Sequence, residues 1–177
     1  MFKKILLLLL LVIVGFVIYV AMLPSDFRIE RSASIAAPAA DVFAQVNDFH
    51  KWEAWSPWAK LDPKATNSFD GPASGVGAIF KWAGNSDVGE GSMEIKESQP
   101  NDLIRIKLDF VKPMEATNTT DFAFKPEGEK TVVTWTMTGK NNFIGRAMCV
   151  FMNMDKMVGG KFDEGLASIK TIVEPKK

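Results

Sequence analysis

The sequence V-G-G-K-F-D-E-G-L-A-S-I-K-T-I-V, residues 158 to 173, decides the fold. Its large apolar residues recur at steps of 4, 4, 3 and 4 positions, at Val158, Phe162, Leu166, Ile169 and Val173. This spacing places them on one face of a helix and leaves the charged residues on the other faces. The sequence therefore predicts a long amphipathic helix near the C-terminus. Gly159 and Gly160 are poor helix formers, so we expect a looser turn over Phe143–Met157 before it.

Strand patterns fill the region before this helix. Apolar and polar residues alternate, or short apolar runs occur, in Ala78–Trp82, Ser92–Lys96, Ile104–Phe110, Phe122–Phe124 and Val133–Thr138. Glycine-rich and proline-containing turns separate these runs, as in an antiparallel meander.

The segment from Phe27 to Ile35 also alternates, which predicts a strand with one buried face. Pro38 suits the first turn of a helix, and a second short helical piece is expected over Phe49–Trp55. The order is strand, two helices, about six strands and a long helix. We expect an α+β fold in which a curved antiparallel sheet of six to seven strands wraps the C-terminal helix, around a packed core or a cavity.

The N-terminus carries a different signal. Ile5–Leu23 is a run of 19 residues in which only Gly15 is not apolar. At about 1.5 Å per residue it spans roughly 28 Å, close to the ~30 Å thickness of a bilayer core. The alternative is a cleaved signal peptide, but bulky Tyr19 lies three positions before Met22, where small residues should flank a cleavage site. We expect a transmembrane anchor over residues 1–24 and one domain over residues 25–177.

Charge predicts the orientation of the anchor and excludes one class of protein. Lys3 and Lys4 precede the apolar run, so the N-terminus should be cytoplasmic and the domain extracytoplasmic, periplasmic or extracellular. The chain has 21 basic and 21 acidic residues, and without the two lysines the domain has a net charge of −2. This balance excludes a basic nucleic-acid binder.

Several strings of the domain resemble one family. They are Arg31–Pro38, Asp41–Phe43, Asn47–Phe49, Trp52–Trp58, Gly75–Ala78, Gly89–Met93, Thr134–Met137 and Phe162–Leu166. In order and spacing the chain resembles the START-related, birch-pollen-allergen-like (SRPBCC) superfamily, in its polyketide cyclase/dehydrase and lipid-transport branch. The resemblance implies a helix-grip fold and covers about residues 27 to 174. That fold hosts carriers, enzymes, regulators and co-chaperones.

Aromatic and methionine side chains are the candidate ligand-binding residues. Tryptophan combines a large apolar ring with one N–H donor, and methionine adapts to irregular shapes, so both suit the wall of a site for a hydrophobic molecule. On the segments that border the cavity of the helix-grip fold, the candidates are Trp52, Trp55, Trp58, Phe80, Trp82, Met93, Phe110, Trp135, Met137, Met154, Met157 and Phe162. Any single one of them could instead be part of an ordinary apolar core, whereas the set as a whole, with the cavity that the resemblance implies, indicates a binding pocket.

Catalytic chemistry has weaker candidates. Asp48, Glu90, Glu115 and Asp155 lie near predicted strand ends or helix starts, where a buried carboxyl group could transfer protons. The sole histidine, His50, suits a surface or capping role. No His/Cys/Glu grouping has metal-ligand spacing, and we expect no metal or cofactor.

The single cysteine, Cys149, excludes an internal disulfide and is expected to be a small buried apolar residue.

Three functions remain open. The first is a single-pass, membrane-tethered, non-catalytic domain that binds a hydrophobic small molecule such as a lipid, quinone or polyketide-like compound. The second is a cyclase, dehydratase or isomerase that uses a buried carboxyl group. The third is a scaffold or regulatory module whose unknown protein partner covers an exposed apolar patch around Trp52–Trp58.

Overall fold

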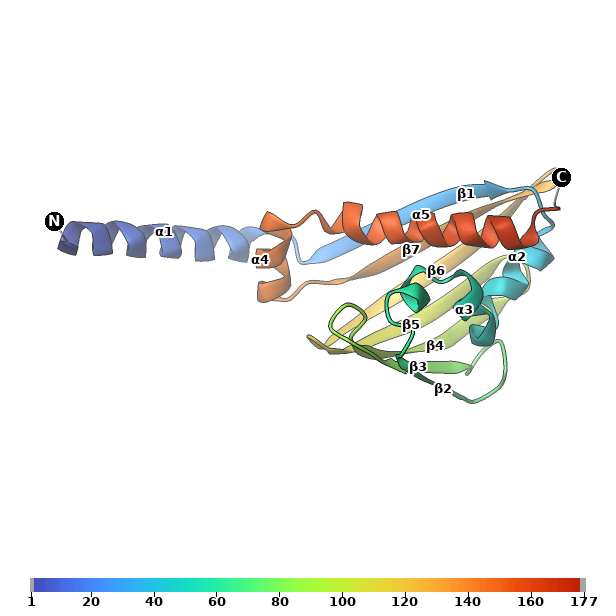
Figure 1. The fold of residues 1–177 in the computed structure, drawn as a ribbon. Coiled ribbons are helices and arrows are strands. Elements are labelled where there is room, and N and C mark those ends of the chain that lie inside the picture. Colours follow the sequence, from blue (N-terminus) through green and yellow to red (C-terminus); the bar gives the residue numbers. More distant parts are fainter. Residues whose placement is uncertain (1, 176–177) are drawn as a thin grey trace.

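A computed structural model of the chain describes residues 2–175. Helix α1 (Phe2–Met22) projects from the rest of the molecule as a single rod (Figure 1). It is long and apolar enough to cross a membrane, as the run Ile5–Leu23 predicts. Only Val20, near its C-terminal end, is buried.

A seven-stranded antiparallel sheet forms the body of the domain. Its strands are β1 (Asp26–Ile35), β2 (Thr66–Asp70), β3 (Ile79–Ala83), β4 (Glu90–Gln99), β5 (Leu103–Lys112), β6 (Ala116–Glu127) and β7 (Lys130–Lys140). They are ordered β1-β7-β6-β5-β4-β3-β2, so the first strand pairs with the last and the others form a meander. This confirms the predicted curved sheet.

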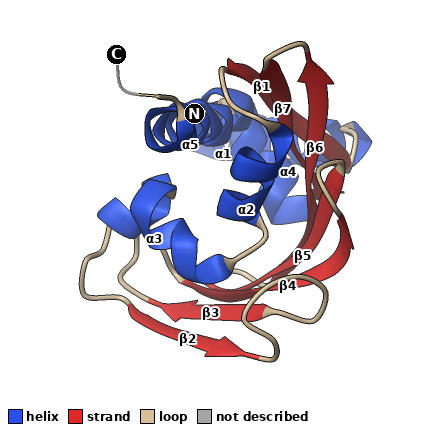
Figure 2. Ribbon diagram, turned by 90° about the vertical axis from the view of Figure 1, so that its right-hand side faces the viewer, coloured by secondary structure: helices blue, strands red, loops and turns tan. Residues whose placement is uncertain are grey.

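The helices lie mainly within the curve of the sheet, as Figure 2 shows for α2, α3 and α5. The remaining elements are α2 (Ala39–Val46), η1 (Phe49–Lys51), α3 (Trp52–Trp55), η2 (Pro57–Lys60), α4 (Phe143–Phe151) and α5 (Met154–Val173). The long C-terminal helix is confirmed, and its predicted face is the packed one, since Phe162, Leu166 and Ile169 are buried. Pro38 is the N-cap of α2, which begins one residue after it.

The core lies between α5, the short helices and the concave face of the sheet, which we call the inner face. Its largest fully buried side chains in the domain include Trp55, Phe49, Phe122, Phe124, Phe162, Ile35, Ile95, Ile104 and Ile106. Burying each of them stabilises the fold by about 1.5–3 kcal/mol before the entropy cost of ordering the chain.

The prediction of a loose turn near the C-terminus is wrong. The segment Phe143–Met157 is not a loose turn, because α4 occupies most of it, and α5 continues through both glycines. Gly159 leaves room for Arg31: a Cβ there would lie 2.1 Å from its Nη2 atom, so the guanidinium would have to move. The side chain of Arg31, which belongs to β1, therefore lies against α5 at Gly159.

Cys149 is also not where the sequence predicts it. It lies on α4 and is exposed, because no other part of the domain covers that helix as a core helix would be covered.

Candidate ligand-binding site

The inner face of the sheet changes from buried to half-buried along its length. At the anchor-side end, where β1 begins and the β5–β6 turn lies, the strand register aligns one residue from each of six strands. This outer row contains Phe27, Gly139, Asn118, Leu108, Met93 and Phe80. Phe27, Leu108 and Phe80 are half-buried, whereas Ile95, Ile104 and Ile106, further from the anchor, are fully buried. The inner face of the sheet is therefore least covered at the end nearest α1.

Trp135 of β7 is the centre of the main ring cluster. Its indole stacks on Phe162 of α5, with centroids 4.1 Å apart and planes 6° apart. The rings of Trp52, Trp55, Trp58 and Phe122 surround it at centroid distances between 4.6 and 6.4 Å. Five predicted ligand-binding residues are thus brought together from β7, α3, η2 and α5.

A second ring cluster lies on β3 and β5. Trp82 stacks on Phe80 at 6.0 Å and meets Phe110 edge-on at 5.9 Å. The Trp82 Nε1–H donates to the carbonyl of Val88, which fixes the ring. The ring lies over Gly91, where a Cβ would come within 2.5 Å of it, so only glycine permits this packing.

The four methionines of the predicted site are divided between two environments. Met93 and Met137 are buried on the inner face. Met154 is half-buried in the first turn of α5, and Met157 is 51% exposed. The inner face thus holds two of the four.

Two buried polar atoms of the inner face have no hydrogen-bond partner among the described residues. They are Nε1 of Trp135, a donor, and Oδ1 of Asn118, an acceptor. Leaving such an atom unpaired costs about 1–3 kcal/mol. By contrast, the Nε1 atoms of Trp52 and Trp55 donate to the carbonyls of Val46 and Gln45 at 3.0 Å. Trp135 and Asn118 are therefore the polar groups that a bound molecule could satisfy.

The predicted ligand-binding residues do not include Phe27, Asn118, Thr120 and Phe122, which also lie on this face. Thr120 is buried, and its register partner is Met137. The sequence does contain a signal for Asn118 and Thr120. They lie four and two residues before Phe122, and alternate residues of a strand face the same side, so they share the face of Phe122 and Phe124.

The weak catalytic candidates all lie outside the core. Asp48 caps η1 and accepts hydrogen bonds from the backbone and ring of His50. Glu90 is half-buried and pairs with Lys112 at 2.7 Å. Glu115 is exposed at the β5–β6 turn.

Asp155 is held by Arg31, which is half-buried between β1 and α5. Both of its carboxylate oxygens accept from the guanidinium, at 3.1 and 2.9 Å. The hydrogen bond from Arg31 lowers the pKa of Asp155 and raises that of Arg31. A carboxylate so stabilised is a poor proton donor near neutral pH.

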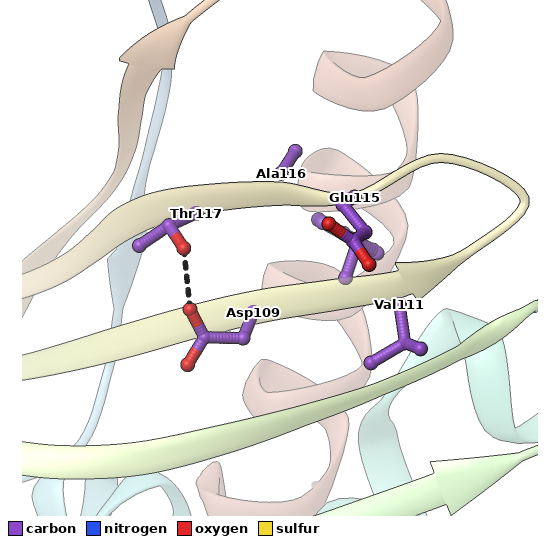
Figure 3. A pocket seen from close by; sticks show the side chains of 6 residues that line it. Asp109, Val111, Glu115, Ala116 and Thr117 are labelled. Carbon is purple, nitrogen blue, oxygen red and sulfur yellow. Dashed lines mark hydrogen bonds between the residues drawn. The ribbon is translucent and has the colours of Figure 1, made fainter.

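An open hollow of about 390 Å³ lies at the β5–β6 hairpin (Figure 3). Asp109 and Thr117 line it, and the Thr117 hydroxyl donates to the Asp109 carboxylate at 2.6 Å. Burial raises the pKa of Asp109, but hydrogen bonds from Lys107 and Thr117 outweigh it and the net pKa is lowered. A second open hollow runs along α1 between Lys3 and Ile13. Neither hollow lies between α5 and the sheet, where ring contacts fill the interior.

Among residues 2–175, no three His, Cys, Asp or Glu side chains gather in a way that could hold a metal ion. Trp52 is 5% exposed and Trp55 is fully buried. These two rings therefore do not form the exposed patch on which the scaffold alternative depends.

Solved structures share this fold at low sequence identity. Protein CV1439 from Chromobacterium violaceum is 16% identical, with a TM-score of 0.58 over 87% of this chain and 100% of that one. The Aha1 dimer from Colwellia psychrerythraea is 17% identical, with a TM-score of 0.59 over 84% and 96%. Protein MLL2253 from Mesorhizobium loti is 13% identical, with a TM-score of 0.61 over 82% and 96%. No curated protein sequence matches the chain.

Residues 26–174 match the family described as polyketide cyclase / dehydrase and lipid transport. The match begins at β1 and ends one residue after α5, so it contains both ring clusters and the outer row. The chain therefore belongs to the polyketide cyclase / dehydrase and lipid transport family.

Proposed function

We propose that the chain is a membrane-tethered protein that binds a hydrophobic small molecule, such as a lipid, quinone or polyketide-like compound, without chemically changing it. Residues 1–24 would be the anchor and residues 25–177 the binding domain. The binding site would be the anchor-side end of the inner face, between the outer row and the ring cluster around Trp135.

One observation carries this proposal: two buried polar atoms without a hydrogen-bond partner among the described residues lie on an inner face that is otherwise mainly aromatic and aliphatic. Asn118 pairs with Gly139, which is four residues beyond Trp135 on β7. At about 3.3 Å per residue, this separates the two positions by roughly 13 Å. An elongated apolar molecule with an acceptor near Trp135 Nε1 and a donor near Asn118 Oδ1 would satisfy both.

Because rings fill the interior, binding requires the half-buried side chains of the outer row to move apart. Phe27 and Leu108 belong to that row, and Trp58 is half-buried over Trp135. Their partial exposure makes their displacement less costly than that of the fully buried rings.

The exposure of α1 supports tethering. A core helix of the same composition would be buried, whereas nearly all of α1 faces outward. A long apolar helix of this kind is stable in a bilayer, whereas exposing its side chains to water is unfavourable in free energy.

The positions of the acidic residues support binding without catalysis. The carboxyl groups of Asp48, Glu90 and Asp155 are engaged by His50, Lys112 and Arg31. Glu115 is exposed on the hairpin. A catalytic acid of the kind expected from the sequence would instead be buried among the rings.

Native mass spectrometry of the full chain, released from detergent after incubation with 12-hydroxydodecanoic acid, which has an acceptor at one end and a hydroxyl donor at the other, or with a short-chain ubiquinol, tests binding. We expect a one-to-one complex with at least one probe, and its weakening in Trp135→Phe and Asn118→Leu. Trp55→Phe is the matched control, because its indole N–H is already bonded to Gln45. A chain that carries neither probe nor any copurified apolar molecule would refute the binding proposal.

Tethering is tested separately. The chain recovered from carbonate-washed membranes should have its full mass of 19.6 kDa. A shorter chain lacking the first 23 or so residues would show a removed signal segment. In intact cells, a membrane-impermeant maleimide should label Lys130→Cys in a Cys149→Ser chain only if the domain is extracytoplasmic.

A further inference from the structure

Helix α4 is apolar on its outward side. In this helix, all of which the structure describes, no side chain is buried. Ile144, Ala147, Met148 and Phe151 recur at the i, i+3, i+4, i+7 spacing of a single helix face. Ile144 is 56% exposed and Phe151 is 78% exposed. Such an apolar stripe in water is unfavourable and indicates a partner.

The only charged residue of α4 is turned to the anchor. Nη1 of Arg146 donates to the carbonyl oxygens of Ala21 at 3.0 Å and Leu23 at 3.1 Å. These carbonyls end α1, where backbone acceptors lack partners within the helix and a positive charge is favourable. Arg146 thus joins the two helices and leaves the outward stripe of α4 without a charge.

The position of α4 along α1 indicates what covers the stripe. Phe151 packs on Phe16 of α1, with ring centroids 5.8 Å apart. Phe16 lies seven residues before Leu23, the end of the apolar run, which corresponds to about 10 Å along the helix axis. Figure 1 shows α4 lying across the axis of α1 at the junction with the domain. Phe151 is therefore level with the last turns of the apolar helix.

We propose that α4 lies in the interface of the bilayer that α1 crosses, with the Ile144–Phe151 stripe among the acyl chains. This inference rests on the tethering part of the proposed function. Interfacial helices bury their apolar faces about 5–10 Å below the headgroups, which agrees with the depth given by Phe16. A stripe continuous with a membrane-spanning helix, and without charge, fits lipid as its partner.

This placement has a consequence for the binding site. The outer row lies at the same end of the domain as α4, since Phe27 follows α1 and Gly139 precedes α4 by four residues. With α4 in the interface, the least covered end of the inner face is turned to the membrane surface. A hydrophobic molecule would then reach the outer row from the bilayer.

Depth-dependent fluorescence quenching in the full chain tests the proposal. Cys149→Ser removes the native thiol, and Ile144→Cys is labelled with bimane on the α4 stripe. The protein is reconstituted into phosphatidylcholine vesicles containing lipids with a nitroxide either near the headgroup or near the chain end. We expect the bimane to lose most of its fluorescence with the shallow nitroxide and much less with the deep one.

Two labelled controls separate the possible failures. Lys130→Cys, at the exposed β6–β7 turn, should keep its fluorescence with both lipids. Val14→Cys, in the middle of the apolar run Ile5–Leu23, should be quenched most by the deep nitroxide. If Val14→Cys is quenched and Ile144→Cys is not, α4 lies outside the lipid and the inference fails while tethering stands. If neither is quenched, tethering itself fails.

A charged stripe gives a second test. Adding Phe151→Asp and Met148→Asp to the labelled chain should remove the quenching at Ile144→Cys, because exposed positions on α4 tolerate charge in folding but not in lipid. Quenching that persists in this variant would mean that the label itself inserts, and would overturn the proposal.

Discussion

The indole N–H groups of Trp135 and Trp52 are in opposite situations within one ring cluster. Both rings are buried, but Trp52 donates to the carbonyl of Val46 and Trp135 donates to nothing in the described chain. Trp135→Phe removes an unsatisfied donor, whereas Trp52→Phe removes a hydrogen bond and leaves the Val46 carbonyl unpaired. We expect Trp52→Phe to lower the free energy of unfolding by about 1–3 kcal/mol more than Trp135→Phe.

Denaturant titration of the two full-chain variants in mild detergent measures this difference. Both changes replace a buried indole with a smaller phenyl ring. The loss of packing energy is therefore similar in the two variants and largely cancels in the difference between their free energies of unfolding. Equal destabilisation would show that the Trp135 N–H has a partner, such as an internal water, in the protein without ligand.

Asp155 supplies a pH-dependent contribution at the seam between β1 and α5. Because Arg31 lowers its pKa below the ordinary value of 3.8, ionised Asp155 stabilises the folded chain above about pH 4. That contribution is lost as the pH falls through the folded-state pKa. Asp155→Asn should therefore lower Tm at pH 7, and the difference from the wild type should be smaller at pH 3, below the ordinary pKa.

Thermal unfolding at the two pH values checks this. Asp26→Asn is the control, since its carboxylate is 3.8 Å from the exposed Lys140 ammonium and should matter less. A Tm difference for Asp155→Asn that is unchanged at pH 3 would contradict the assignment.

Residue chemistry made part of the ring cluster predictable. Tryptophan and phenylalanine are predicted wall residues because their rings are large and apolar, and four of them, Trp52, Trp55, Trp58 and Phe162, meet around a fifth, Trp135. Asn118 and Thr120 are not among the predicted site residues, because the string T-N-T-T, residues 117 to 120, is polar throughout and shows no apolar alternation. The alternation of Phe122 and Phe124, extended back along β6, and the strand register together show that two of these four residues face the core.

Among the elements, α5 offers a matched pair of adjacent glycines. A Cβ at Gly160 would meet nothing within 4 Å, whereas one at Gly159 would clash with the Arg31 guanidinium. Alanine is favoured over glycine in a helix by about 1 kcal/mol. Gly160→Ala should therefore stabilise the fold by about 0.5–1 kcal/mol, and Gly159→Ala should gain nothing because Arg31 must leave Asp155.

The comparison is made by the shift in denaturation midpoint of the two variants relative to the wild type. An equal gain for both would mean that Arg31 repacks freely and that its contact with Asp155 contributes little.

Element prediction succeeded where a periodic apolar pattern has one buried face. This held for β1, for the meander and for the face of α5. It failed for β2, a sheet-edge strand whose sequence T-N-S-F-D is exposed at every position. It failed for α4, because this helix begins at a cap that helix propensity does not show: the Asn142 side chain accepts from the Gly145 N–H.

At the scale of the whole molecule, the junction between α1 and the domain is short, and its polar contact is made by Arg146. Only Leu23, Pro24 and Ser25 separate α1 from β1. Arg146 crosses this gap from α4, and the packing of Phe16 and Phe151 adds an apolar contact. The domain is therefore held at a set angle to the anchor, and Arg146 is the group whose loss should free it.

Arg146→Ala should broaden the distribution of distances between α1 and the sheet. Spin labels on Val17→Cys and Ser68→Cys, both exposed positions, in a Cys149→Ser chain report this distance by double electron–electron resonance in vesicles. The wild-type arginine should give one narrow distribution. Without it, the carbonyls of Ala21 and Leu23 lose their charged donor, and the three-residue link allows the domain to tilt.

Lys140→Ala is the matched control, since Lys140 is a cation at the same end of the sheet whose partner Asp26 is 3.8 Å away and exposed. Exposed pairs of this kind contribute about 0–1 kcal/mol, so the distribution should stay narrow. Equal widths in the wild type and Arg146→Ala would show that α4 is held by lipid and by Phe16 alone. In that case the orientation of the domain would come from the membrane and not from the bridge to α1.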